Sequence, residues 1–208
     1  GYVWSALVPK LLSAGYEDRV LDSMIYTPKW LDSVKIKCDI IEGDIRNLET
    51  IKKSLEGIDA VIHLAAISND PSADLDPKLT EDVNFHATKS LAEIAKNTGV
   101  KRFIFASSGS VYGIKSEPEV TENLSLEPLT IYSKTKVWSE QALKELNDEN
   151  FTTVSIRPAT VCGYSPRQRL DVVVNILASN ALTKGDLTVF AGEQKRPNVH
   201  MDDMTDLY

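Results

Sequence analysis

The chain has 208 residues, enough for one domain and part of a second. Hydrophobic residues make up 42% and charged residues 25%, which excludes collagen, a disulfide scaffold and general disorder. The net charge is -7 with no basic cluster, so nucleic acid is not an expected partner. Cys38 and Cys162 lack metal-ligand spacing, and no apolar run reaches the roughly 18 residues of a membrane span. We therefore expect a cytoplasmic protein without a metal site or a membrane partner.

Helical and extended patterns alternate along most of the chain. In the first helix Pro9 is expected to cost stability or cause a kink, and Gly15 supplies the stop. Asn47 caps a later helix. The predicted elements are a helix over 2–14, strands over 19–21 and 35–41, a helix over 47–55, a strand over 58–66, a helix over 79–97, a strand over 102–106, a helix over 132–147 and a strand over 152–156.

This alternation predicts a parallel sheet covered by helices on both faces, the doubly wound α/β class. Because the chain begins in a turn that leads into a helix, we expect the first strand of that sheet to be missing. The alternation weakens after Arg157. We therefore place one domain at residues 1–160, and the start of a small C-terminal substrate-binding region, with some returning elements of the first domain, at residues 161–208.

Ligands of such sheets bind beyond the carboxyl ends of the strands. Asp22 ends the second predicted element, 21 positions after Gly1, where an acidic side chain binds a cofactor ribose hydroxyl. A carboxylate there repels a 2′-phosphate, which favours NAD over NADP. A plain turn residue is the alternative interpretation of Asp22.

The strongest local signal is YSKTK at 132–136, which places Tyr132 and Lys136 one turn apart on a helix. A tyrosine is a poor base at neutral pH, and lowering its pKa by about 3 units takes about 4 kcal/mol of differential stabilisation. A neighbouring ammonium and a cationic cofactor would supply it. Alone, this spacing also occurs as an ordinary surface pattern.

Ser108 lies 24 residues before Tyr132, within ASSGSVYG at 106–113. This segment resembles the SSSxVYG segment of the extended short-chain dehydrogenase/reductase family, specifically its nucleotide-sugar epimerases and dehydratases. The resemblance covers nearly the whole chain and rests on GYVWS at 1–5, VLD at 20–22, GDIRN at 43–47, HLAA at 63–66, VNFHAT at 83–88, YSKTK at 132–136, RPATVCG at 157–163 and RPNVHMDD at 196–203.

The resemblance implies a Rossmann-like fold, NAD as cofactor, a nucleotide-diphosphate sugar as substrate and a homodimer for the complete protein. Ser108, Tyr132 and Lys136 would be catalytic, and Ser108 would also bind substrate together with Asn175 and Arg196. Tyr132 and Lys136 would also contact the cofactor. The other cofactor-binding residues that it implies are Gly1, Tyr2, Val3, Asp22, Asp44, Ile45, Leu64, Ala65, Ala66, Asn84, Ile156 and Pro158.

Two departures from the family pattern affect the expected function. Trp4 stands where the third glycine of the phosphate turn belongs, so close packing at that turn is in doubt. Gly109 and Ser110 replace the Asp-Glu pair with which 4,6-dehydratases eliminate water, which favours an NAD-dependent epimerase acting at C4. The alternatives are a dehydratase, reductase or dehydrogenase of the same family, a catalytically silent NAD-sensing module, and a fragment that does not fold alone.

Overall fold

The computed structural model describes residues 1–26, 38–190 and 192–208. By their internal contacts these residues form two compact units, which are described separately. Of the described residues, unit 1 comprises 1–18, 26, 38–39, 158–190 and 192–208, and unit 2 comprises 19–25 and 40–157. The division of the sequence at residue 160 stays a prediction. Within the described residues, no helix combines the length and the apolar character needed to cross a membrane.

The centre of unit 2 is a three-stranded parallel sheet in the order β3-β4-β5. The strands are β3 (Ala60–His63), β4 (Arg102–Ala106) and β5 (Thr152–Ile156), and Phe103 aligns with Val61 on one side and Thr153 on the other. The bounds of β4 and β5 match the prediction. The parallel pairing confirms the α/β class, and it brings the carboxyl ends of the three strands to one edge.

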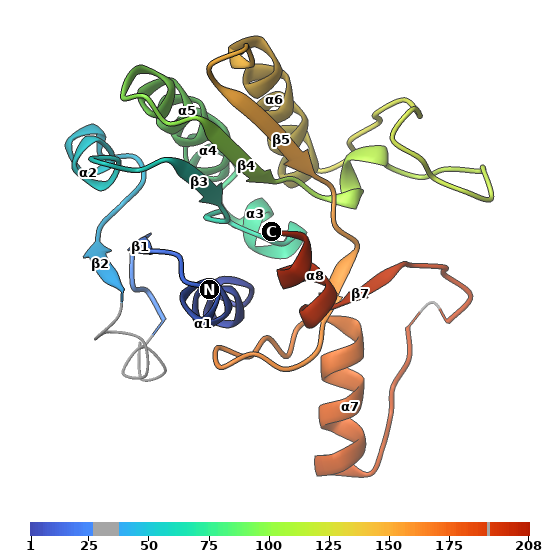
Figure 1. Ribbon diagram of the computed structural model, residues 1–208. Helices are drawn as coiled ribbons and strands as arrows, with labels where there is room; N and C mark the ends of the chain where they lie inside the picture. The colour runs from blue at the N-terminus through green and yellow to red at the C-terminus, as the bar shows by residue number, and fades with distance from the viewer. Residues whose placement is uncertain (27–37, 191) are drawn as a thin grey trace. The chain divides into compact units, whose positions relative to one another are not determined.

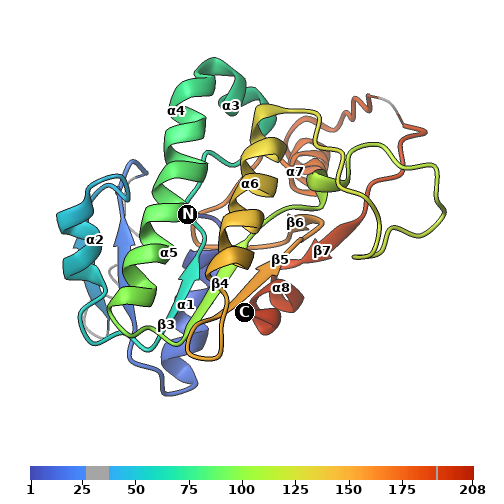
Figure 2. The same ribbon diagram turned by 90° about the horizontal axis from the view of Figure 1, so that it is seen from above.

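Helices α2 (Leu48–Ser54), α5 (Ala87–Asn97) and α6 (Ile131–Leu146) contribute to the core against one face of this sheet. Figures 1 and 2 show α5 and α6 lying side by side over one face of the sheet. Alternate residues of β4 point into this core, where Phe103 and Phe105 are fully buried. Asn47 caps α2 as predicted, since its side chain accepts hydrogen bonds from the amides of Glu49 and Thr50.

The prediction of one continuous α-helix over 79–97 is wrong, because the helical segment is divided into several elements. The chain forms α3 (Asp70–Leu75), then α4 (Pro77–Glu81), a π-helical turn η2 (Asp82–His86), and α5. The side chain of Asp76 accepts from the amide of Leu79 and so caps α4. The π-turn inserts an extra residue into the helix, a feature that hydrophobic periodicity does not reveal.

Strands β1 (Arg19–Asp22) and β2 (Asp39–Glu42) pair in a separate two-stranded sheet. The amide of Gly43 donates to the carbonyl of Asp22 at 3.0 Å. The strand predicted at 35–41 lies partly outside the described residues, and the observed strand runs one residue further, to Glu42.

Unit 1 contains α1 (Trp4–Ser13), β6 (Thr160–Cys162), α7 (Val173–Lys184), β7 (Asn198–His200) and α8 (Met201–Leu207). Strands β6 and β7 pair in parallel, and α1 packs on α8. Helix α1 continues through Pro9, and the carbonyl of Pro9 accepts a hydrogen bond from the Ser13 hydroxyl.

Candidate active site

Helix α6 carries Tyr132 and Lys136, and a capping box determines where this helix begins. The Thr130 hydroxyl oxygen accepts from the amide of Ser133, and the Ser133 side chain accepts from the amide of Thr130. The Thr130 hydroxyl also donates to the Asp70 carboxylate at 2.7 Å, which ties the start of α6 to α3. Tyr132 therefore lies in an anchored first turn and is half-buried.

The Lys136 side chain is buried, and its ammonium donates to the carbonyl oxygen of Ala106 at 2.7 Å. The nitrogen lies 4.8 Å from the centre of the Phe105 ring and 5.6 Å from the centre of the Tyr132 ring. Burial lowers the pKa of Lys136 to about 7, while the nearby charge of Glu140 acts in the opposite direction. The predicted Tyr132–Lys136 pairing is thus present as a ring beside a buried amine.

Ser108 is the N-cap residue of the short 3-10 helix η3 (Gly109–Tyr112), and this helix packs on α6. The Ser108 hydroxyl oxygen accepts from both the amide and the hydroxyl of Ser110, at 3.2 and 2.9 Å. The turn ends at Gly113, where φ is +70° and a Cβ would lie 2.2 Å from the carbonyl oxygen of Glu127. Only glycine fits there, so the Ser108 turn has a defined end.

Two predicted cofactor carboxylates follow strands β1 and β2. The Asp22 carboxylate accepts from the amide of Met24 at 2.8 Å. The Asp44 carboxylate is bound by the guanidinium and the amide of Arg46, and these hydrogen bonds lower the pKa of Asp44. Ile45 beside it is buried. A ligand that uses Asp44 must therefore share that carboxylate with Arg46.

Asn84 is buried in the π-turn and holds the segment after β3. Its side-chain oxygen accepts from the amide of Ile67, and its nitrogen donates to the carbonyl of Ile67, at 2.8 and 3.0 Å. This pairing fixes the exit of the chain just after the three predicted cofactor-lining residues Leu64, Ala65 and Ala66.

Several predicted site residues belong to unit 1. The Asn175 side chain accepts from the amide of Gly163 and donates to the Tyr2 hydroxyl and the carbonyl of Arg169, so both ends of its amide are engaged. Burial raises the pKa of Tyr2. Arg196 is exposed and donates to Gln194. The predicted residues in unit 1 are Gly1, Tyr2, Val3, Pro158, Asn175 and Arg196.

The donor set of unit 2 fits a dinucleotide cofactor. A carboxylate at the end of β1, Asp22, suits ribose hydroxyl groups, and Lys136 is a buried cation on α6 beside the end of β4. Residues Leu64 to Ala66 supply small and apolar groups at the end of β3. Among the described residues, no three His, Cys, Asp or Glu side chains are arranged to hold a metal ion.

One group of residues was missed by the sequence analysis. Glu140 is buried one turn after Lys136, and its carboxylate accepts hydrogen bonds from Arg157 and from the Ser107 hydroxyl. Arg157 also donates to the Tyr112 hydroxyl at 2.9 Å. We call Ser107, Tyr112, Glu140 and Arg157 the Glu140 cluster. The four-residue spacing of Lys136 and Glu140 was the available signal, because both lie on one helix face.

Because His63 is buried, we predict that the free energy of unfolding depends on pH. The His63 side chain is buried on β3, bonded to Thr88, and burial lowers its pKa to about 3 from the ordinary 6.5. The unfolded chain then binds a proton that the folded chain does not, so stability falls as the pH drops below 6.5, by up to about 1.4 kcal/mol per pH unit. Urea unfolding at a series of pH values measures this slope.

The controls for this prediction are two histidine variants. His63→Leu should flatten the slope relative to the natural chain, whereas His86→Gln, which removes an exposed ring 3.2 Å from Glu81, should change it much less. An equal slope in the natural chain and His63→Leu would contradict the assignment.

Comparison with known proteins identifies similar chains. The model of the family described as "NAD dependent epimerase/dehydratase family" matches residues 1–208. A UDP-glucose 4-epimerase of Lactobacillus helveticus is 29% identical over 228 residues, covering 100% of this chain and 68% of that protein. The chain spans 68% of the length of this relative and 51% of the length of a second relative, from Bacillus subtilis.

Two solved structures have a similar fold. The UDP-glucuronic acid 4-epimerase of Bacillus cereus, in complex with UDP-glucuronic acid and NAD, is 31% identical with a TM-score of 0.86, and the match covers 99% of this chain and 68% of that chain. A dTDP-glucose 4,6-dehydratase of Streptomyces venezuelae, with NAD bound, is 27% identical with a TM-score of 0.87, and the match covers 98% of this chain and 66% of that chain.

Proposed function

The chain belongs to the NAD-dependent epimerase/dehydratase family, and from this premise we propose that it epimerises a nucleotide-diphosphate sugar at C4 through a transient keto sugar. The observation that carries the proposal is the buried Lys136 ammonium, which lies beside the Tyr132 ring and is held by the carbonyl of Ala106, two residues before Ser108. A cation in that place favours the phenolate form of Tyr132 over the phenol. This interaction would lower the free-energy cost of using Tyr132 as a base.

In the proposed mechanism Tyr132, as phenolate, takes the proton from the C4 hydroxyl of the sugar, and Ser108 donates a hydrogen bond to the same oxygen. Bound NAD supplies the acceptor for the carbon-bound hydride and later its donor. Tyr132 would then return its proton to the C4 oxygen of the reduced sugar, and the carbon is inverted if the keto sugar has turned over in the site before its reduction. Lys136 would hold the nicotinamide ribose and stabilise the charge on Tyr132.

The other residues assigned to ligands keep the roles that the family resemblance implies. Asp22 would bind the adenosine ribose, Asp44 and Ile45 would border the adenine, and Asn84, which holds the segment at Ile67, would support the cofactor through it. By the same resemblance Gly1 to Val3, Leu64 to Ala66, Ile156 and Pro158 would contact NAD, and Asn175 and Arg196 would contact the diphosphate. Asn175 would first have to release a hydrogen bond to Tyr2 or Arg169.

Epimerisation is favoured over dehydration because Gly109 and Ser110 follow Ser108. Neither offers a carboxyl group, whereas elimination of water needs a further acid and a further base. The test incubates the full chain with NAD and, in turn, UDP-glucose, UDP-glucuronic acid and dTDP-glucose. An epimer without net NADH is expected. Net NADH would instead indicate a dehydrogenase, and a 4-keto-6-deoxy sugar a dehydratase.

Trp4 supports a second candidate, a silent NAD-sensing module with a damaged phosphate turn. Trp4 is the first residue of α1, and a Cβ on Gly1 would lie 3.1 Å from the Trp4 ring. Gly1 has no side chain, so the indole overpacks nothing here, but a ring this close to Gly1 would compete with a cofactor diphosphate for the same space. Trp4→Gly should therefore raise the affinity for NAD about tenfold, measured by calorimetry.

The matched control for this prediction is Ser13→Gly, which adds a glycine at the other end of α1. It should leave the NAD affinity unchanged. If Trp4→Gly binds NAD no better than the natural chain, the indole does not hinder the cofactor and the silent candidate loses its basis.

The proposal includes a homodimer in the complete protein, a cytoplasmic location and no nucleic-acid partner. The acidic net charge of -7 supports the absence of nucleic acid. Light scattering of the purified protein tests the dimer.

A further inference from the structure

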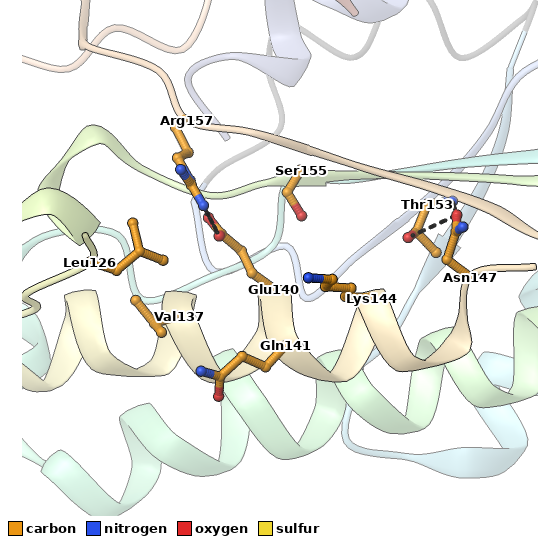
Figure 3. Close-up of a pocket in the computed structure, with 9 residues that line it drawn as sticks. All are labelled: Leu126, Val137, Glu140, Gln141, Lys144, Asn147, Thr153, Ser155 and Arg157. Carbon is orange, nitrogen blue, oxygen red and sulfur yellow. Dashed lines mark hydrogen bonds and ion pairs between the residues drawn. The ribbon is translucent and has the colours of Figure 1, made fainter. Parts of the chain in front are cut away.

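The carboxylate of Glu140 joins three separate segments of unit 2. It accepts from Arg157 Nη2 at 2.6 Å and from Arg157 Nε at 3.0 and 3.2 Å, just after β5. It also accepts a short hydrogen bond from the Ser107 hydroxyl at the end of β4. Glu140 and Arg157 both line a pocket of about 470 Å³. Figure 3 shows their side chains facing each other, one from α6 and one from the segment after β5.

These contacts reach the backbone of the candidate catalytic residues. Ser107 directly precedes Ser108, and its amide donates to the carbonyl of Ile156 at 2.8 Å. Tyr112, at the end of the same 3-10 helix, accepts from Arg157, whose guanidinium lies 5.1 Å from the centre of the Tyr112 ring. The Ser108 turn is therefore held at both ends by groups that converge on Glu140.

Glu140 also lies one helical turn after Lys136, on the same face of α6. Lys136 and Glu140 are both buried, so their charges interact with little screening by water. The titratable or charged groups around Lys136 are Tyr132 and Glu140 on α6, His63 on β3 and, bonded to Glu140, Arg157 after β5. Glu140 is the only carboxylate among these four groups, and it is buried.

We propose that Glu140 is a positioning residue of the active site, which holds the Ser108 turn in register with Lys136 and Tyr132 through Ser107 and Arg157. This inference rests on the proposed function for the meaning of Ser108 and Tyr132. It has an electrostatic consequence. The Glu140 carboxylate favours the charged form of Lys136, which burial opposes, and so favours the phenolate of Tyr132.

The principal variant is Glu140→Gln, which keeps the shape of the side chain and removes its charge. The matched control is Glu145→Gln, an exposed position on the same helix. We expect Glu140→Gln to lower kcat about 10–100-fold with KM nearly unchanged, because a small displacement of catalytic groups is costly to the rate. The acidic limb of the pH profile should move up by about one pH unit.

A readout independent of activity is the ultraviolet absorbance of tyrosinate, titrated without NAD or sugar. Subtracting the curve of a Tyr132→Phe variant on each background isolates the ionisation of Tyr132. Glu140→Gln should shift this ionisation to higher pH, and Glu145→Gln should not. A purely structural ion pair would change stability and leave this titration in place, so an unchanged Tyr132 titration in folded Glu140→Gln overturns the electrostatic consequence.

Ser107→Ala tests the positioning role even if Glu140→Gln fails to fold, because it removes one hydrogen bond and keeps the ion pair. We expect a several-fold loss of kcat with KM and the pH profile unchanged. A natural rate in Ser107→Ala overturns the positioning role. If the natural chain converts no sugar, the proposed function fails by itself, while the tyrosinate titration still decides whether Glu140 controls Tyr132.

Discussion

Tyr132→Phe should abolish sugar interconversion while leaving the fold in place and costing NAD binding no more than one hydrogen bond. The substitution removes only the phenolic oxygen, the proposed base, so kcat should fall by at least about 10²–10⁴-fold. The half-buried ring and its contact with Lys136 are retained, so the variant should still unfold cooperatively on heating. The rate is measured by chromatography of the sugars, and binding by calorimetry with NAD.

The control for Tyr132→Phe is Tyr16→Phe, which makes the same chemical change at a tyrosine that is 64% exposed. Tyr16→Phe should have the natural rate. If Tyr132→Phe keeps more than about a tenth of the natural rate, general-base catalysis by this residue is wrong.

Arg157→Met should strongly destabilise unit 2. The Arg157 and Glu140 side chains are only 20% and 9% exposed, and methionine leaves the carboxylate buried without a cation. Removing one partner of a buried pair costs about 3–5 kcal/mol. The hydrogen bonds to Glu140 raise the pKa of Arg157, so this loss should appear throughout the neutral range. Urea denaturation measures the free energy of unfolding.

A matched exposed pair gives the reference for Arg157→Met. Lys52→Met breaks the pair with Glu49, whose two side chains are 57% and 83% exposed, and should cost at most about 0.5 kcal/mol. A double variant, Arg157→Met with Glu140→Leu, should recover much of the loss because no unpaired charge is left. A cost below about 1 kcal/mol for Arg157→Met alone would contradict the account of the cluster.

Strands β4 and β5 could be predicted to the residue because each is a short run of β-favouring residues bounded by polar or turn-forming residues. Strand β3 could not, since the apolar run extends to Ala66 while its pairing with β4 ends at His63. Apolar character reports burial and does not report backbone pairing. The residues after His63 leave the sheet, and the amide of Asn84 holds that exit through Ile67.

The candidate site was predictable where its spacing is local. Tyr132 and Lys136 are four residues apart, so the helix alone brings them to one face. The partners of Glu140 are 17 and 33 residues away, and a glutamate in a helix ordinarily indicates a solvated face. The burial of Glu140 results from tertiary packing, and the hydrophobic periodicity of the sequence carries no information about that packing. The engagement of Asn175 with Gly163 depends in the same way on the packing of unit 1.

The most direct measurement of the central claim uses a nucleotide sugar with deuterium at C4, incubated with the full chain and NAD. The account predicts an epimer that retains the deuterium on the inverted carbon, with no net NADH, and no such product from Tyr132→Phe. Deuterium lost to water, or the same product formed by Tyr132→Phe, would contradict it.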